Sequence, residues 1–497
     1  MSVHARFGMS AKGLLVAAGV VLMAWLAPAV AGQDAAAVIA AASKNMGADV
    51  LNTIEFSATG FDFVLGQAYA PDAPWPKFIN KSFTRVVDFR VPSSRVDRVR
   101  MQGENPPRGG GQQPLRGEQT QSQTLIVNTG TPWVQQLDIW MSPHGFLKAA
   151  AANNATVKSQ TLGGKKYNVL TFMGQNKAPV RGYVSGENLV ERVETTIDNA
   201  MLGDLAFEAI YSDYKDFGGV KVPTRMVQRQ GGFPIVDLTV TDVKPNAPVT
   251  IQAPAGRGAP PAAPAAAPAG GGQVPSEKLA DGVYLILGGY ASLAVDFKDY
   301  IVVIEGPQSE ERASAIIAEA KRLIPGKAIR YVVNTHHHFD HASGLRTFVA
   351  EGATVVTHQV NKAYFEKTFS APHTLNPDKL AAAKRKPTFE TVTEKKVMTD
   401  GNHVIELHHL QGSGHNAGLL VAYLPKEKIL VEADAYNPPA QPNAPTPNPL
   451  SPYNTNLVEN IERLKLDVAT IIPIHYAADG RKVTKAELMK AVGKEGN

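Results

Sequence analysis

Hydrophobic and polar residues alternate along several segments of the first 250 residues. A period of two is typical of strands that bury one face. Turn sequences such as Gly218-Gly219 and Gly231-Gly232 separate these segments. Two helices are also expected, one over residues 34–53 and one from Ser142-Pro143, where serine can cap the helix and proline suits its first position. The pattern predicts a mainly antiparallel β domain, whose clearest strands are residues 81–89, 165–172, 189–195 and 235–243.

Strands and helices alternate after residue 275. A helix with one apolar face is expected over residues 309–323, and a buried strand over residues 328–334. Further strands are expected at residues 283–287, 291–297 and 300–304. Sheets covered by helices are the usual product of this order, so the C-terminal half is expected to be an α/β domain.

A segment rich in proline, alanine and glycine divides these two regions. Residues 253–275 lack both large apolar residues and a hydrophobic period, as linkers do. We therefore expect a β-rich domain at residues 32–250, a linker at 251–275 and a second domain at 276–497. Residues 105–123, rich in glycine and glutamine, are expected to form a loop between strands of the first domain.

The first thirty-one residues have the features of an export signal. His4, Arg6 and Lys12 give a weakly basic start before an apolar stretch at residues 13–26, and Ala29-Val30-Ala31 offers small residues for cleavage. We expect a bacterial protein that is periplasmic or secreted, with residues 1–31 removed. No later apolar run approaches the roughly 20 residues of a spanning helix, so the mature chain is expected to have no integral membrane segment.

The amino-acid composition limits which kinds of metal site and which partners are expected. The chain has no cysteine, so a metal must be held by nitrogen and oxygen, and thiolate catalysis is excluded. The 50 basic and 45 acidic residues give a formal net charge of +5 and are spread along the chain. Such a spread is typical of a solvated surface, so no nucleic-acid partner is expected.

Residues 335–341, with the sequence THHHFDH, carry the strongest chemical signal. In an extended segment residues two apart point the same way, so His336 and His338 can converge on one ion while His337 points elsewhere. Asp340 and His341 follow closely and are better placed to serve a second ion. The segment therefore predicts a metal site.

Three further residues suited to metals follow predicted strands or turns. His415 lies in a glycine-lined turn, Asp434 follows a strand at residues 429–432, and His475 follows a strand at residues 471–474. Side chains gathered at one edge of a sheet form one site, so we expect these residues to join the histidine-rich segment.

This order of residues resembles the metallo-β-lactamase superfamily, over about residues 282–475: an H-x-H-x-D-H motif, then a single histidine, an aspartate and a final histidine. The resemblance implies a four-layered αββα sandwich with the site along one edge. It also implies that Asp434 bridges two ions, the first held by His336, His338 and His415 and the second by Asp340, His341 and His475.

Two positions depart from patterns common in that superfamily. Its lactamase branches usually have cysteine or serine where this chain has Asp434, whereas glyoxalase-II-like and lactonase-like branches bridge with aspartate. Hydrolysis of β-lactams is therefore not the favoured reaction. Glu305 stands where many relatives have an aspartate that supports the histidine segment.

These residues predict a dinuclear metal-dependent hydrolase that acts on a small-molecule substrate. Two divalent ions, Zn²⁺ first and Mn²⁺ or Fe²⁺ as alternatives, would share a water molecule and lower its pKa from ~15.7 towards ~7. The hydroxide would attack an ester, lactone, thioester or amide carbonyl. Asp340 is the candidate catalytic residue, because it would both bind metal and orient the nucleophile.

Weaker candidates flank the predicted ligands. Asn416, Tyr436 and Tyr476 could donate a hydrogen bond to the substrate, although a turn or core role suits each as well. Residues 437–452 form a proline-rich loop directly after the Asp434 strand, and we expect this loop to form one wall of the substrate pocket.

Two other functions stay open. Residues 182–223 resemble the curved half-barrel of periplasmic lipoprotein-carrier proteins, in which an open sheet wraps around helices and can hold apolar ligands. That resemblance implies a carrier or binding protein with a vestigial metal domain. Histidine and carboxylate ligands also suit iron, so a mononuclear iron dioxygenase of the same fold is the other alternative.

Overall fold

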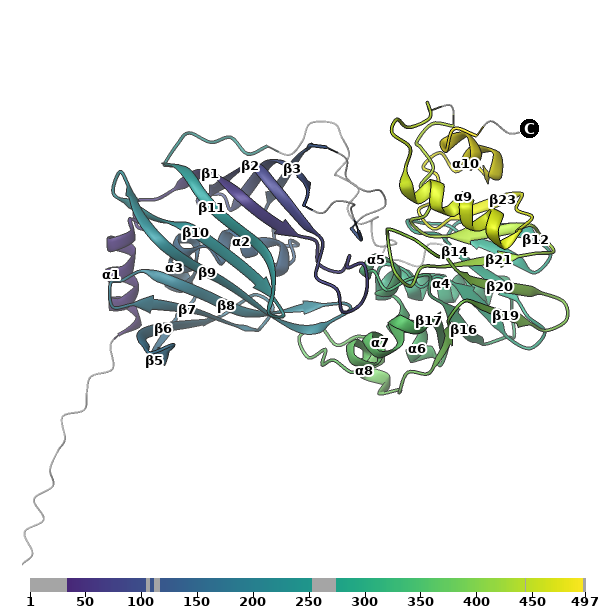
Figure 1. Cartoon of the computed structure of the whole chain (residues 1–497). Helices are drawn as coiled ribbons and strands as arrows, with labels where there is room; N and C mark the ends of the chain where they lie inside the picture. Colours follow the sequence, from purple (N-terminus) through teal and green to yellow (C-terminus); the bar gives the residue numbers. More distant parts are fainter. Residues whose placement is uncertain (1–33, 104–107, 111–116, 253–273, 443, 495–497) are drawn as a thin grey trace, which may run out of the picture.

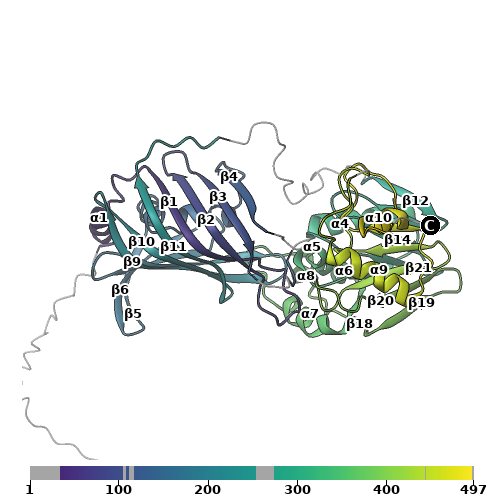
Figure 2. The ribbon, with the colours of Figure 1, turned by 45° about the horizontal axis from the view of Figure 1, so that its top comes forward.

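Residues 34–103, 108–110, 117–252, 274–442 and 444–494 are described by a computed structural model of the chain. They form three β-sheets with covering helices (Figure 1, Figure 2). The expected export signal and most of the expected linker lie outside the described residues. The first sheet ends before this linker, and the other two sheets follow it.

The first sheet has eleven strands among the described residues, and every neighbouring pair is antiparallel. Pairing of the first strand with the last joins two runs of consecutive hairpins into the order β4-β3-β2-β1-β11-β10-β9-β8-β7-β6-β5. This confirms the predicted antiparallel β domain. The strands are β1 (Thr53–Phe63), β2 (Lys77–Asp88), β3 (Ser93–Gln102), β4 (Gln119–Ile126), β5 (Thr156–Leu162), β6 (Lys165–Met173), β7 (Pro179–Ser185), β8 (Val190–Asn199), β9 (Gly203–Phe217), β10 (Val220–Gln230) and β11 (Phe233–Pro245).

Helices pack against this curved sheet (Figure 2). The helices are α1 (Ala35–Met46), the short pair η1 (Trp133–Gln136) and α2 (Leu137–Trp140), and α3 (Pro143–Ala152). Apolar side chains of α1 and α3 share one buried core with strands β6 to β9. The amide of Gly145 donates to the Ser142 side chain at 3.2 Å, and Pro143 occupies the first helical position, as predicted.

Two expected boundaries in this domain are wrong. The helix expected over residues 34–53 ends at Met46, because Gly47 adopts the left-handed conformation (φ 69) and its amide caps the helix by donating to the Lys44 carbonyl. The loop expected over residues 105–123 is also too long, since β4 already begins at Gln119.

The second and third sheets lie after the linker. The second runs in the order β12 (Ser276–Ala280), β13 (Val283–Ile286), β14 (Ser292–Asp296), β15 (Ile301–Ile304), β16 (Ile329–Val333), β17 (Thr354–His358) and β18 (Phe389–Val392). The third runs β19 (Lys395–Thr399), β20 (Val404–His409), β21 (Leu420–Leu424), β22 (Ile429–Glu432), β23 (Thr470–Pro473) and β24 (Val483–Thr484).

These two sheets are stacked between two layers of helices, as the expected αββα sandwich requires. Alternate residues explain the stacking: on β15, Ile301 and Val303 face a core shared with the first helical layer, while Val302 and Ile304 face the core between the sheets. The helices of the first layer are α4 (Glu310–Leu323), α6 (Leu345–Glu351), α7 (Lys362–Phe369) and α8 (Lys379–Ala383), with α5 (Phe339–Ala342) and η2 (Gln359–Asn361) as short turns between elements. Helices α9 (Pro452–Leu464) and α10 (Lys485–Ala491) cover the third sheet.

The described helices include no candidate membrane span, since none combines the length and the hydropathy that crossing a bilayer requires.

Candidate metal centre

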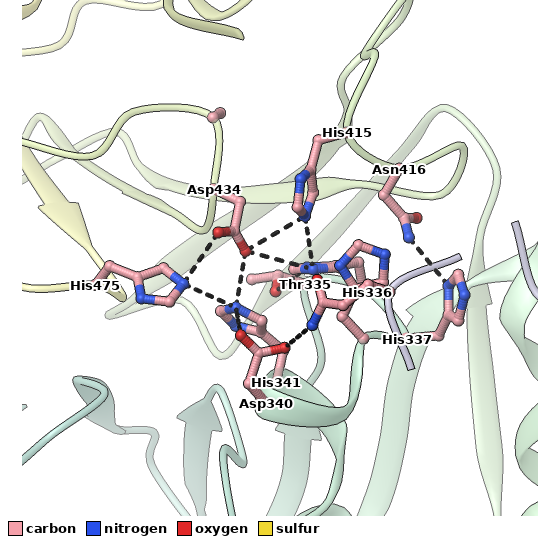
Figure 3. A network of polar contacts seen from close by, with 12 residues as sticks. Thr335, His336, His337, Asp340, His341, His415, Asn416, Asp434 and His475 are labelled. Atoms are coloured by element: carbon pink, nitrogen blue, oxygen red, sulfur yellow. Dashed lines mark hydrogen bonds and ion pairs between the residues drawn. The ribbon is translucent and has the colours of Figure 1, made fainter. Parts of the chain in front are cut away.

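Four connections deliver the seven predicted ligands to one edge of the sandwich (Figure 3). Residues 335–341 leave the end of β16 and enter α5. His415 lies between β20 and β21. Asp434 and His475 follow β22 and β23, which are parallel neighbours, so their carboxyl ends meet at the same edge.

Three histidines form the first group. The ligand nitrogens of His336, His338 and His415 all lie within 4.8 Å of one another, and the three residues are fully buried. The Nε2 atoms of His336 and His415 are 3.2 Å apart. Two imidazole nitrogens that face each other this closely can both direct lone pairs at a shared cation.

Asp340, His341 and His475 form the second group, again within 4.8 Å of one another. The Nε2 atoms of His341 and His475 are 3.2 Å apart, and the nearer Asp340 oxygen lies 3.6 Å from His341 Nε2.

The Asp434 carboxylate lies between the two groups. Its Oδ2 is 2.8 Å from His341 Nε2 and 3.4 Å from the Nε2 atoms of both His336 and His415, while its Oδ1 is 3.0 Å from His475 Nε2. The structure therefore brings all seven predicted residues together, with the aspartate in the central position.

The turn that presents Asp434 is held by a buried carboxyl group. Asp434 has φ 59, a left-handed conformation that a non-glycine residue keeps only where its surroundings impose it. Glu432 at the end of β22 accepts hydrogen bonds from the amides of Ala435 and Tyr436, at 3.0 and 2.9 Å. These two bonds close the turn around Asp434.

Burial and charge set the protonation of the cluster. Burial lowers the pKa of His336 and His338 well below the usual value, and the neighbouring imidazoles add to this effect, so both rings are neutral. Burial also lowers the pKa of His341, but the Asp340 and Asp434 carboxylates outweigh it and raise this pKa well above the usual value. Burial raises the pKa of Asp434, yet the surrounding histidines hold it well below the usual value, so this residue is anionic.

Glu305, one of the two positions that depart from the superfamily pattern, contacts the histidine segment. Its Oε2 accepts a hydrogen bond of 2.6 Å from Thr335 Oγ1 and lies 3.8 Å from His341 Nδ1. The Thr335 hydroxyl also contacts His336 Nδ1 at 3.1 Å. The Glu305 carboxylate thus lies near His341 and is linked to His336 through the Thr335 hydroxyl.

Residues 294–475 match the family model described as the metallo-beta-lactamase superfamily. The C-terminal domain is a metallo-beta-lactamase domain. Among curated proteins, "Metallo-beta-lactamase type 2" of Elizabethkingia meningoseptica is 30% identical over 132 residues, which are 26% of this chain and 46% of that relative. The match thus spans less than half the length of the relative.

Solved structures of metallo-beta-lactamases are similar as well. The DIM-1 enzyme is 17% identical and covers 45% of this chain and 97% of its own, with a TM-score of 0.33. The enzyme from Pontibacter korlensis is 18% identical, with coverages of 44% and 98% and the same TM-score of 0.33.

His337 is directed away from the seven candidate ligands, as its place between His336 and His338 predicts (Figure 3). Its Nδ1 lies 3.1 Å from Asn416 Nδ2, and burial lowers its pKa to about 3. The Asn416 Oδ1 accepts from the Gly418 amide at 2.9 Å. Asn416 therefore holds the His415 turn in place, which is the turn role considered for it.

Tyr436 and Tyr476 lie in apolar surroundings. The Tyr436 ring is part of the core under α9 and α10, and burial raises its pKa to about 12. Tyr476 is partly buried against the core between the sheets. Tyr436 also lines a cavity of about 460 Å³ together with the proline-rich loop, α10 and Gln119. None of the seven predicted ligands is among the described residues that line this cavity, so its role as a substrate pocket stays a prediction.

Three residues at the site carried no recognisable sequence signal. Tyr290 OH donates to Asp340 Oδ2 at 2.9 Å, from the loop between β13 and β14. Tyr453, at the start of α9, places its ring 5.4 Å from that of His415. Asn334 Nδ2 donates to the His336 carbonyl at 2.6 Å. Each belongs to a loop or an element end whose position depends on the fold.

Proposed function

We propose that the chain is a dinuclear metal-dependent hydrolase. In this proposal His336, His338 and His415 hold one ion, Asp340, His341 and His475 hold the second, and Asp434 contacts both. The observation that carries it is the convergence of the donor atoms into two groups that meet at one buried carboxylate.

The donor set fits divalent ions. Nδ1 of His338 is buried and has no hydrogen-bond partner among the described residues, and leaving a buried polar atom without a partner costs free energy unless a ligand such as a metal ion binds it. Neutral imidazoles and anionic carboxylates without sulfur suit Zn²⁺, and also Mn²⁺ and Fe²⁺.

When bound, two such ions supply a water molecule of lowered pKa and polarise a substrate carbonyl. The chain's own groups orient the reaction. Asp340 has a side chain that is 30% exposed, so it can reach both the cluster and a substrate. Burial raises the pKa of Tyr290 well above its usual value and the Asp340 carboxylate raises it further, so the phenol stays protonated and donates to Asp340.

We propose an acyl substrate, namely an ester, lactone, thioester or amide. Asp434 as the central carboxylate supports the first three, as in the aspartate-bridged branches that the motif resembles. The curated relative is named as a metallo-beta-lactamase, so β-lactams belong in the same panel.

The test is a hydrolysis screen of the purified full chain, loaded with Zn²⁺ or Mn²⁺, on lactones, β-lactams, thioesters and phosphodiesters. We expect two ions per chain by elemental analysis and turnover of at least one acyl class. Asp434→Asn should lose metal and turnover together, whereas Asp299→Asn, which changes an exposed aspartate in the turn after β14, should lose neither. A chain that binds one iron ion and consumes oxygen would instead favour the dioxygenase alternative.

A carrier function makes a different prediction. The concave side of the first sheet holds a cavity of about 430 Å³, whose lining includes Arg85, Arg98, Arg100, Asp62 and Asp138. The same lining includes apolar residues such as Leu65, Phe83 and Phe207, so a ligand with both polar and apolar groups suits it better than a wholly apolar one. Lipid that copurifies with a chain inactive on the whole panel would overturn the hydrolase proposal.

A further inference from the structure

We infer that the loop between β1 and β2, residues 64–76 of the N-terminal domain, is a working part of the active site, in which Gln67 and Ala68 position Asp340 and His338 for metal. This inference rests on the proposed dinuclear site. It assigns a role to a domain that lies outside the matched family region.

The loop reaches the metal-binding segment through its backbone. The Gly66 carbonyl accepts from the Phe339 amide at 3.2 Å, and the Tyr69 carbonyl accepts from the Ala417 amide at 2.8 Å. These two bonds fasten the loop to the two segments that carry His338 and His415. In Figure 1 the dark segment that follows β1 accordingly lies against α5.

Close packing fixes the position of the loop. A Cβ atom placed on Gly66 would lie 2.4 Å from the Phe339 ring, so only glycine fits there. The Trp75 ring packs edge-on against the Phe339 ring, with the two ring centroids 6.2 Å apart. At the base of the loop the Val64 amide donates to the Pro76 carbonyl at 3.0 Å.

The Ala68 carbonyl selects which nitrogen of His338 can bind metal. His338 Nε2 lies 2.8 Å from this carbonyl oxygen, which can only accept a hydrogen bond. The proton must therefore sit on Nε2. Nδ1 then carries the lone pair, and it is the buried nitrogen that has no partner among the described residues. A carbonyl that fixes the tautomer of a ligating histidine is a common support of metal sites.

Gln67 holds the one exposed ligand. Its Nε2 donates to Asp340 Oδ1 at 2.8 Å, while Tyr290 OH donates to Oδ2 at 2.9 Å. Each carboxylate oxygen thus accepts one bond, from a different domain. Because Asp340 is far more exposed than the other six residues, it depends on such bonds for a single orientation.

The experiment compares two variants of the full chain that keep the length of the side chain. Gln67→Met removes the donor, and Gln67→Glu replaces it with a second carboxylate facing Asp340. Asp72→Asn changes an exposed residue of the same loop and is the matched control. The readouts are the visible spectrum of the Co²⁺-loaded protein, which reports ligand geometry, and Zn²⁺ affinity measured against a chelator.

We expect both Gln67 variants to change the Co²⁺ spectrum and to weaken binding of the second Zn²⁺ by about 10- to 100-fold, with the Glu variant more affected. The control should match the wild type. Spectra and affinities equal to those of the wild type would overturn the inference, as would variants that simply fail to fold, since the loop would then be structural. A wild-type chain that binds no Co²⁺ or Zn²⁺ would instead overturn the proposed function.

Discussion

Asp340 differs from the other predicted ligands in its exposure and in its partners. The remaining six side chains are at most 8% exposed, whereas that of Asp340 is 30% exposed and is held by hydrogen bonds from two loops. These two hydrogen bonds hold the carboxylate in one orientation at the rim of the cluster, where it is accessible to solvent.

Replacing Asp340 with alanine should therefore abolish most turnover. We expect a fall in kcat of at least about 100-fold, because the variant loses an orienting base as well as a ligand. The measurement is kcat of the metal-loaded variant on the best substrate of the panel, with metal content determined in parallel. Asp299→Ala serves as the exposed control, and near-normal turnover in Asp340→Ala would remove Asp340 from the catalytic role.

At the scale of elements, one buried arginine connects three helices of the metallo-beta-lactamase domain. Arg346 of α6 forms a bidentate pair with Asp378, the N-cap of α8, and donates to the Phe369 carbonyl at the end of α7 at 3.0 Å. Arg346 is 3% exposed, so its charge is compensated within the protein. This pair therefore fixes how α6, which follows the metal-binding segment, packs on its neighbours.

Asp378→Ala should lower the free energy of unfolding by about 3–5 kcal/mol, because it leaves a buried guanidinium without its counter-charge. Urea unfolding of the full chain measures this. Glu366→Ala, which breaks the exposed Lys362–Glu366 pair at 3.8 Å on α7, should cost less than about 1 kcal/mol. Equal costs for the two variants would mean that Arg346 finds other partners.

In the N-terminal domain His144 makes the packing of α3 sensitive to acid. The ring is buried, with Nε2 3.2 Å from the Met46 carbonyl. Burial, with a smaller contribution from the nearby Lys148, lowers the pKa of His144 to about 4 against the opposing effect of this carbonyl. The unfolded chain, with a pKa near 6.5, therefore binds a proton between pH 6.5 and 4 that the folded chain does not.

The contribution of His144 to the free energy of unfolding is therefore fully present above pH 6.5. It is lost as the pH falls toward 4. Between pH 7 and pH 5 the wild type should lose about 2 kcal/mol through His144. His144→Gln keeps a donor for the Met46 carbonyl and does not titrate, so its unfolding free energy should change less over this interval. Parallel pH profiles in the two proteins would contradict this account.

At the scale of the whole molecule, the two domains meet at the edge of the sandwich that carries the candidate metal centre. The β1–β2 loop contacts the metal-binding segment, and the amide of Gly109 donates to the Gly414 carbonyl at 3.0 Å beside His415. The first domain therefore contacts both segments that carry His338 and His415.

Export is the remaining proposal at this scale. The mature protein isolated from a bacterial host should begin at Gly32 and be found outside the cytoplasm, because small residues precede that position after an apolar stretch. Intact mass and fractionation measure both features. A chain that keeps its first thirty-one residues in the cytoplasmic fraction would remove this proposal.

Sequence by itself was enough to name the seven candidate ligands, because the patterns that mark them are local. Alternation within an extended segment separates His336 and His338 from His337, and ligands placed after buried strands must meet where parallel strands end. The same periodicity located α4, β16 and β22 to within a residue or two. Helix α1 ends earlier than predicted, because Gly47 adopts the left-handed conformation and terminates it. The composition of the following residues gave no sign of this end.

Only the tertiary structure decided what surrounds that ligand set. Gln67 and Asp340 are 273 residues apart, and Ala68 acts through a backbone carbonyl that no side-chain pattern can mark. Their contact depends on how two domains dock, which is set by shape and burial across the interface and leaves no periodic signal in the chain. The sequence thus named the residues that can bind metal, and the fold supplied the hydrogen bonds that orient them.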